Sequence, residues 1–185
     1  ALDWRRFVSD QSLDFFLAES APLRSITPGV PVTVNMMGTY PVLDYWKWAR
    51  HVDVVSWDSY PHWHRPAGEG SPAGTLADAD EASRAAFVHD LNRSFKGGRP
   101  WLLIESTPSQ VNWQKVNRLK APGLHRLSSL QAVAHGSDSV MYFQWRKGRG
   151  GFEKYHGAVV DHVGHEGTRV FREVAGRLPP SPATL

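Results

Sequence analysis

Four short apolar stretches, each followed by a segment with helical character, most constrain the fold of this 185-residue chain. The stretches are residues 30–36, 53–58, 100–105 and 139–145, and their apolar character is nearly continuous. This pattern is typical of parallel strands that helices cover on both faces, since half-solvated strands alternate polar and apolar residues. The sequence therefore predicts an α/β fold, either a doubly wound sheet or part of a (β/α)8 barrel.

Helical segments separate these strands and complete the expected domain. The first segment has apolar residues at imperfect helical spacing, and a Pro-Gly pair follows it. Gly97-Gly98 and Gly136 end two of the others. The expected helices are residues 1–20, 41–52, 80–95, 125–135 and 168–178. We therefore expect one domain over residues 1–178 and a tail or linker over residues 179–185.

Polar and aromatic side chains gather just after each predicted strand, and they favour the barrel. They are Asn35, Asp58 with Tyr60, Glu105, and Gln144 with Trp145. In a barrel such positions converge on the C-terminal face, where active sites lie. No Gly-rich phosphate loop follows the first strand, which weakens a nucleotide-binding interpretation. Four strands cannot close a barrel, so we expect another segment or chain to complete it, or the sequence to be a piece of a longer protein.

Composition excludes several classes of protein. The chain has no cysteine, which rules out disulfides, thiolate metal sites and thiol catalysis. No apolar run approaches the roughly 18 residues of a membrane span. The net charge of +3 is spread along the chain, and its densest run, residues 146–149, is interpreted as a solvated loop. A basic nucleic-acid-binding module would bind with steep salt dependence; we expect no such partner, no membrane partner and a cytoplasmic location.

Glu105 carries the most chemical information, because it ends a very apolar strand immediately before a long loop. A carboxylate there is poorly solvated unless it is paired, and a structural salt bridge is the alternative to a catalytic role. The residues around it, 103–113, resemble the nucleophile motif of family 42 glycoside hydrolases, the microbial β-galactosidases. The resemblance extends over essentially the whole chain, through residues 2–7, 34–38, 56–61, 141–146 and 152–157.

The resemblance implies a fold and a place in it. Members of this family are (β/α)8 barrels with the nucleophile at the end of the seventh strand and the acid/base at the end of the fourth. Placing Glu105 on the seventh strand makes the four predicted strands the fifth to eighth. We therefore expect the C-terminal half of a TIM barrel, with the N-terminal half as its missing partner.

The resemblance also implies a retaining mechanism in which Glu105 attacks the anomeric carbon and forms a glycosyl-enzyme. Such an enzyme needs a second carboxyl group about 5–5.5 Å away. In the family this is a Glu preceded by Asn, and no Asn-Glu pair occurs in the sequence. Its expected position precedes residue 1. We expect a fragment or subunit of an exo-β-galactosidase that is inactive alone, with a non-catalytic galactoside-binding remnant as the alternative.

Four further residues match family positions around the sugar. Tyr60 resembles the tyrosine that orients the nucleophile, and its alternative role is to cap a loop before Pro61. Trp113 matches the tryptophan that lines the sugar subsite; a core role is the alternative. Glu153 and His156 match the pair that hydrogen-bonds galactose hydroxyls, a task that suits an acceptor and a donor; the alternative is a surface pair in a Gly-rich loop.

Histidine pairs raise the question of a metal. His62 and His64 form a His-x-His pair, and His162 with His165 form a second, weaker pair, but two ligands do not make a site. The family's zinc cluster uses cysteines from the other half of the barrel. We therefore expect no metal and no cofactor, a galactoside oligosaccharide as substrate, and a homo-oligomer, since family members are often trimeric.

Overall fold

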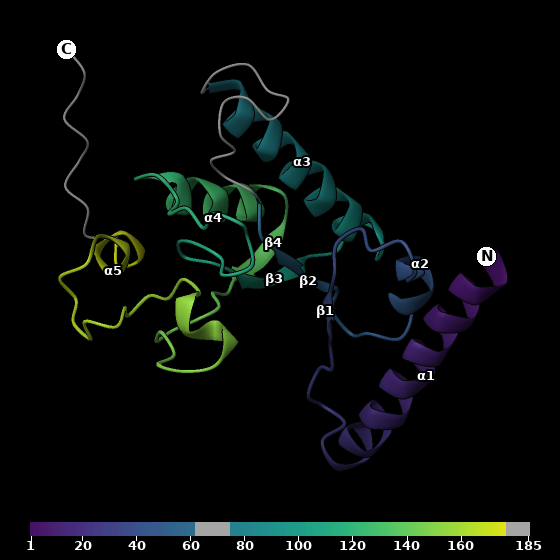
Figure 1. The fold of residues 1–185 in the computed structure, drawn as a ribbon. Coiled ribbons are helices and arrows are strands. Elements are labelled where there is room, and N and C mark those ends of the chain that lie inside the picture. The colour runs from purple at the N-terminus through teal and green to yellow at the C-terminus, as the bar shows by residue number, and fades with distance from the viewer. Residues whose placement is uncertain (62–74, 177–185) are drawn as a thin grey trace.

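A four-stranded parallel sheet is at the centre of the computed structural model, which describes residues 1–61 and 75–176 (Figure 1). Its strands are β1 (Asn35–Met36), β2 (Ser56–Ser59), β3 (Trp101–Ser106) and β4 (Ser137–Val140). They pair in chain order, β1-β2-β3-β4, and every pairing is parallel. The predicted α/β class and the four predicted strands are therefore confirmed.

Helices connect consecutive strands, as a parallel sheet requires. The connecting helices are α2 (Tyr45–Trp48), α3 (Thr75–Ser94) and α4 (Leu124–Ala134). Helix α1 (Leu2–Ile26) precedes β1, and a 3-10 turn, η1 (Phe152–Tyr155), and α5 (Arg169–Val174) follow β4. Helices α3 and α4 lie beside each other and contact β2 and β4 respectively, whereas α1 lies at the β1 end beside α2 (Figure 1). No helix in the described ranges has both the length and the apolar character to cross a membrane.

The first two strands begin later than predicted. At their predicted starts, hydrogen bonds between Val32 and Asp53, one of them to the Asp53 side chain, replace the regular strand-to-strand pattern. The Val32 amide donates to Oδ2 of Asp53 at 2.7 Å, and the Asp53 amide donates to the Val32 carbonyl at 2.9 Å. Asp53 also pairs with Arg24 of α1 at 3.0 Å. These contacts tie the chain before β1 and β2 to α1, and the ladder begins only beyond them.

The fourth strand is also displaced, since it covers Ser137–Val140 rather than residues 139–145. Beyond Val140 the chain leaves the ladder: the Phe143 amide donates to the Ser106 carbonyl at 2.7 Å, and the Val159 amide donates to the Gln144 carbonyl at 3.0 Å. The apolar run therefore continues past the strand into the segment that forms the edge of the site.

Helix lengths differ from the predicted ones at several ends. Helix α1 continues through Pro22 to Ile26. Proline costs the helix only one internal hydrogen bond, and the last turn still closes, with the Thr27 amide donating to the Leu23 carbonyl at 2.8 Å. Helix α2 is only four residues long, and α5 ends at Val174. Residues 177–178 of the last predicted helix lie outside the described residues.

An aromatic core packs between the sheet and its helices. Trp101 is fully buried and stacks on His89 of α3, with ring centroids 4.9 Å apart. Trp57 contacts both rings, and Leu103 is buried beside them. Burial of such rings contributes most of the packing energy in a small core. One face of the sheet is thus apolar and covered by helices, which leaves the opposite face for polar side chains.

Candidate active site

Three neighbouring strands bring one polar side chain each to the face opposite the helices. Asn35 comes from β1, Asp58 from β2 and Glu105 from β3. The amide nitrogen of Asn35 donates to Oδ2 of Asp58 at 3.0 Å and to Oε2 of Glu105 at 3.3 Å. Because one amide contacts both carboxyl groups, the three side chains form a single cluster at the carboxyl ends of the strands.

A register shift puts Glu105 on this face. Trp57 is paired with Leu103, but Asp58 is paired with Glu105, so β3 has one additional residue, Ile104, at this point. A one-residue shift moves the following side chains to the opposite face of a strand, and such irregularities often redirect a side chain beside an active site. Without the shift, Glu105 would share the helix-covered face of Leu103.

Tyr60 holds the other oxygen of Glu105. Its hydroxyl donates to Oε1 at 2.5 Å. Burial, the hydrogen bond to Glu105 and the nearby carboxylates raise the pKa of Tyr60 well above its usual value. The phenol therefore keeps its proton and acts as a donor at every working pH. Each carboxylate oxygen of Glu105 thus accepts one hydrogen bond, from Tyr60 on one side and Asn35 on the other.

Asp58 has the most perturbed carboxyl group of the cluster. Burial and the charge of Glu105 raise its pKa to about 6, while the hydrogen bond from Asn35 opposes the shift. Its Oδ2 accepts from Asn35, but its Oδ1 is buried with no hydrogen-bond partner among the described residues. A perturbed carboxyl group of this kind is a common mark of a functional site.

Aromatic rings form a wall beside the carboxylates. Trp113 meets Tyr60 edge-on with ring centroids 4.9 Å apart, and it meets His156 at 5.6 Å. Phe143 packs edge-on against His156 at 4.9 Å. Trp113 stays 53% exposed, which leaves a ring surface open beside Glu105. An aromatic face of this kind packs well on the C–H groups of a sugar.

His156 is fully buried among these rings. Its Nδ1 lies 3.0 Å from the Gly157 carbonyl oxygen, and its Nε2 has no hydrogen-bond partner among the described residues. A buried ring nitrogen without a partner is costly. The structure therefore brings a second unsatisfied polar atom close to the cluster, beside the exposed Trp113.

Glu153 stands at the exposed rim on the turn η1. The amide of Asn112 joins it to the loop after β3, donating to Oε2 of Glu153 at 3.0 Å and to the Phe152 carbonyl at 2.7 Å. Gln144 donates to the Glu153 carbonyl at 3.2 Å. The rim is thus hydrogen-bonded to the same loop that carries Trp113.

The structure brings all five predicted residues into one region. Tyr60 contacts Glu105, Trp113 and His156 through the hydrogen bond and ring contacts above, and Glu153 is connected to them through the Asn112 loop. Their roles remain predictions. The sequence indicates Asn35 and Asp58 only as strand-end polar residues and predicts no role for them. Phe143 and Asn112 could not be predicted as part of the site, because the sequence offers no signal for them beyond proximity to a strand or to Trp113.

The comparison with protein families decides the assignment. The model of the family 42 glycoside hydrolases, described as β-galactosidase, matches residues 1–178. This chain belongs to that family.

Relatives within family 42 are similar along nearly all of the chain. Pbg of Clostridium perfringens, a β-galactosidase, is 56% identical over 176 residues and matches 94% of the chain. The β-galactosidase BglY of Alicyclobacillus acidocaldarius is 60% identical over 173 residues, again 94% of the chain. In both cases the match covers only 24% of the relative, so the chain spans about a quarter of the length of these proteins.

Solved family 42 structures have the same fold over this segment. A catalytic mutant of Gan42B, a β-galactosidase from G. stearothermophilus, is 52% identical with a TM-score of 0.86, over 96% of this chain and 25% of its own. The β-galactosidase from Bacillus circulans sp. alkalophilus is 51% identical with a TM-score of 0.84, over 96% of this chain and 24% of its own.

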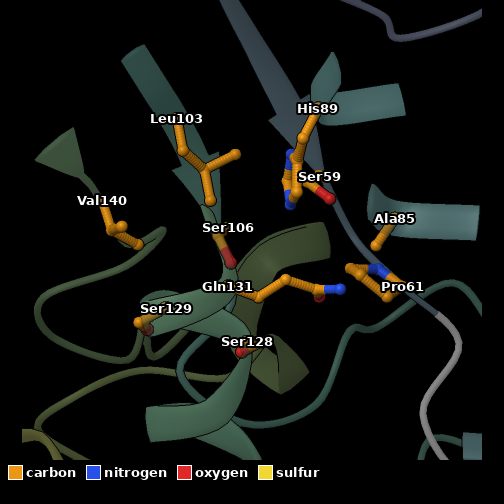
Figure 2. A pocket seen from close by; sticks show the side chains of 10 residues that line it. All are labelled: Ser59, Pro61, Ala85, His89, Leu103, Ser106, Ser128, Ser129, Gln131 and Val140. Atoms are coloured by element: carbon orange, nitrogen blue, oxygen red, sulfur yellow. The ribbon is translucent and has the colours of Figure 1, made fainter. Parts of the chain in front are cut away.

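The family 42 segment also has a small cavity on the helix side of the sheet (Figure 2). Its walls include Ser59 and Ser106 at the ends of β2 and β3, His89 of α3, and Gln131 of α4. The cavity volume of about 10 Å³ has room for about one water molecule. It is therefore too small for a sugar, and it lies on the face opposite Glu105.

Metal-ligating side chains do not gather into a site in the described part of this family 42 chain, where no group of three His, Asp or Glu is suitably placed. One ring nitrogen of His162 is hydrogen-bonded to the backbone, since its Nε2 lies 2.8 Å from the Gly148 carbonyl oxygen. The pair His62 and His64 lies outside the described residues.

Proposed function

We propose that this chain provides the nucleophile of a retaining β-galactosidase. The observation that carries the proposal is the two-point support of Glu105, whose Oε1 accepts from Tyr60 at 2.5 Å and whose Oε2 accepts from Asn35 at 3.3 Å. Donors on both oxygens fix the direction of the carboxylate, as an oriented nucleophile requires. The names of the relatives support galactose as the sugar.

The proposed reaction has two steps. A carboxylate oxygen of Glu105 forms a bond to the anomeric carbon of a terminal β-galactoside while the bond to the aglycone oxygen breaks. A second carboxyl group gives its proton to the leaving oxygen. That group then takes a proton from water, which attacks the anomeric carbon and releases Glu105 unchanged. Trp113, Glu153 and His156 would bind the galactose.

Asp58 does not fit the part of the second carboxyl group, although its pKa of about 6 suits an acid. It shares the amide of Asn35 with Glu105 on the same sheet face, and its Oδ1 is buried. Acid and nucleophile must instead flank the scissile bond. We therefore infer that the acid/base lies outside this chain, which contains no Asn-Glu pair.

We further infer that residues 1–178 form the C-terminal half of a (β/α)8 barrel, strands five to eight. The strand order follows the chain without the reversal of a doubly wound sheet. Exposed apolar side chains on α1, including Trp4 at 65% and Phe15 at 65%, support a covering neighbour. Residues 179–185 lie outside the described residues, and the cytoplasmic location and homo-oligomer remain predictions.

Replacement of Glu105 in the complete enzyme tests the nucleophile. We expect Glu105→Gly to lower turnover at least about 10³-fold. Added azide should restore activity and give α-galactosyl azide, because the small anion occupies the vacated space and attacks from the same side. Glu19→Gln provides a control at an exposed position of α1. Substantial turnover by the Glu105 variant without azide would disprove the assignment.

A non-catalytic galactoside-binding remnant is the second candidate, and the absence of an Asn-Glu pair favours it. Loss of the acid/base removes general-acid help worth roughly 10²–10⁴-fold. Calorimetry with galactose on the 185-residue chain tests binding, and an aryl galactoside assay on the same sample tests hydrolysis. No heat at millimolar galactose would contradict the remnant, and normal turnover would contradict both the remnant and the missing acid/base.

A further inference from the structure

The side chain of Asn35 uses both of its N–H groups on carboxylates. A primary amide has two N–H donors on one side and a carbonyl acceptor on the other. Here the nitrogen lies 3.0 Å from Oδ2 of Asp58 and 3.3 Å from Oε2 of Glu105. Because both carboxylate oxygens are acceptors, the amide nitrogen of Asn35, and not its carbonyl oxygen, must face them. The pair of carboxylates therefore determines the orientation of the amide.

Asp58 is the stronger of the two restraints. Its contact with the amide is the shorter one, and it is anchored on β2 by the ladder that pairs it with Glu105. Without the charge at residue 58, Asn35 would keep only a neutral acceptor there, which holds its amide about half as strongly, and the amide could rotate its carbonyl oxygen toward Glu105. The Asn35 carbonyl oxygen would then repel Oε2 of Glu105, where the amide N–H now donates to it.

We propose that Asp58 is a positioning residue that acts on the nucleophile through Asn35, holding the amide so that it fixes Oε2 of Glu105. The proposal rests on the function proposed above for Glu105. It assigns Asp58 no contact with the substrate and no proton transfer.

The charge of Asp58 adds a second effect in the same direction. The titratable groups that face it are Glu105 from β3, Tyr60 from the end of β2, and Tyr45 from α2. Glu105 and Asp58 are like charges held side by side, and Oδ1 of Asp58 has no partner among the described residues. Formation of the glycosyl-enzyme turns Glu105 into a neutral ester, so the repulsion is relieved in the first chemical step.

This geometry gives the effect a pH dependence. Because the pKa of Asp58 is about 6, the side chain is charged well above pH 6 and neutral well below it. Asp58→Asn has the shape of the neutral form at every pH. The variant should therefore differ from the wild type at neutral pH and resemble it in acid, an outcome that a merely structural defect would not produce.

The test measures glycosyl-enzyme formation by the complete enzyme. The rate constant of inactivation by a 2-deoxy-2-fluoro-galactoside reports this step alone. We expect Asp58→Asn to lower it roughly 10- to 100-fold at pH 7.5, as small misplacements of a catalytic group do, and by less than about threefold at pH 5. Asp138→Asn is the control, since Asp138 is an exposed residue on the same sheet; it should match the wild type at both values.

A double-mutant cycle with Asn35→Ala tests the route of the effect. If Asp58 acts through Asn35, then Asp58→Asn should have a smaller effect in the Asn35→Ala background than alone, and the remainder is the direct repulsion between the two carboxylates. Equal ratios to wild type at pH 5 and 7.5, or full additivity with Asn35→Ala, would overturn the proposal. The azide experiment on Glu105 is separate, so a normal result for Asp58→Asn leaves the nucleophile assignment standing, while failure of azide rescue removes the basis of both.

Discussion

Asp58 pairs with Glu105 across β2 and β3, whereas one residue earlier Trp57 pairs with Leu103. Ile104 is the additional residue, and it turns Glu105 from the face of the aromatic core to the face of the polar cluster. The same strand thus buries Leu103 against the helices and presents Glu105 to Tyr60. The reactivity proposed for Glu105 depends on this local irregularity, since only on this face can it accept from both donors.

Removal of the Tyr60 hydroxyl should weaken catalysis with little effect on folding. Tyr60→Phe keeps the ring contacts with Trp113 and His156 but deletes the 2.5 Å hydrogen bond to Oε1 of Glu105. We expect kcat/KM of the complete enzyme to fall roughly 10- to 1,000-fold, because an oriented donor to a developing or reacting charge is worth a few kcal/mol. Steady-state kinetics with an aryl galactoside measures this.

The matched control for that change is Tyr155→Phe, since Tyr155 is 61% exposed and lies on the rim rather than beside Glu105. It should leave kcat/KM within about twofold, as surface changes usually do. If the two variants behaved alike, the hydrogen bond from Tyr60 would have no special role.

Truncation of Trp113 should affect sugar binding first. Its ring is 53% exposed and borders both Tyr60 and His156. We expect Trp113→Ala to raise KM about tenfold, or ~1.4 kcal/mol, because the apolar face of a sugar loses its packing partner. Trp113→Phe should recover part of the loss. An unchanged KM in both variants would show that the ring is structural only.

Much of the fold could be predicted from the sequence, because it depends on local patterns. The apolar stretches at residues 53–58 and 100–105 are strands in the structure, with shifted ends, since any parallel strand covered by helices must be apolar. The ends could not be predicted. Asp53 replaces the ladder before β2 by pairing with Val32, a partner distant in the sequence. Helix α1 runs past Pro22 because its last turn still closes at Thr27.

Less of the site than of the fold could be predicted from the sequence. Tyr60 could be predicted, because it lies in a motif that resembles family 42 and to which the family assigns a role. Asn35 and Asp58 interact with Glu105 through a contact between residues up to 70 positions apart and through a register shift that leaves no mark on the apolar pattern. The burial of His156 was likewise unexpected, because a Gly-rich loop normally predicts exposure.

Acid should destabilise the fold through its buried histidines. Burial and then the nearby His135 lower the pKa of His89 to about 4, while Asp90 opposes the shift. The unfolded state therefore binds a proton between pH 6.5 and pH 4 that the folded state does not, and stability is lost as the pH falls through this window. The loss from His89 amounts to at most about 3 kcal/mol.

His89→Phe in the complete enzyme should reduce that pH dependence, because a phenyl ring can stack on Trp101 without titrating. Part of it should remain, since burial and Lys120 also lower the pKa of His125 to about 4. The urea midpoint, measured from pH 7 to pH 4, checks this against His165→Phe, a change at an exposed position. Identical pH dependence in the His89 variant and the wild type would show that His89 is not responsible.

Gly157 provides the sharpest steric test of the site, because no side chain fits there. A β-carbon at Gly157 would lie 2.6 Å from the Gln110 carbonyl oxygen, 2.6 Å from Oγ1 of Thr107 and 2.9 Å from the Gln110 amide nitrogen. The Gly157 amide also donates to that carbonyl at 2.8 Å. Two of the three clashing atoms are backbone, so the loop after β3 must move, and His156 must move with it.

Gly157→Ala should therefore lower the free energy of unfolding by about 1–3 kcal/mol and reduce kcat/KM as well, since the displaced segments carry His156 and follow Glu105. Gly150→Ala is a matched control in the neighbouring loop, where a β-carbon meets nothing within 4 Å; it should change stability by less than about 0.5 kcal/mol. Denaturant unfolding and steady-state kinetics on both variants of the complete enzyme decide the matter. Equal, small effects would mean that the segment from Gln110 to Gly157 yields easily and does not hold the sugar-binding wall in place.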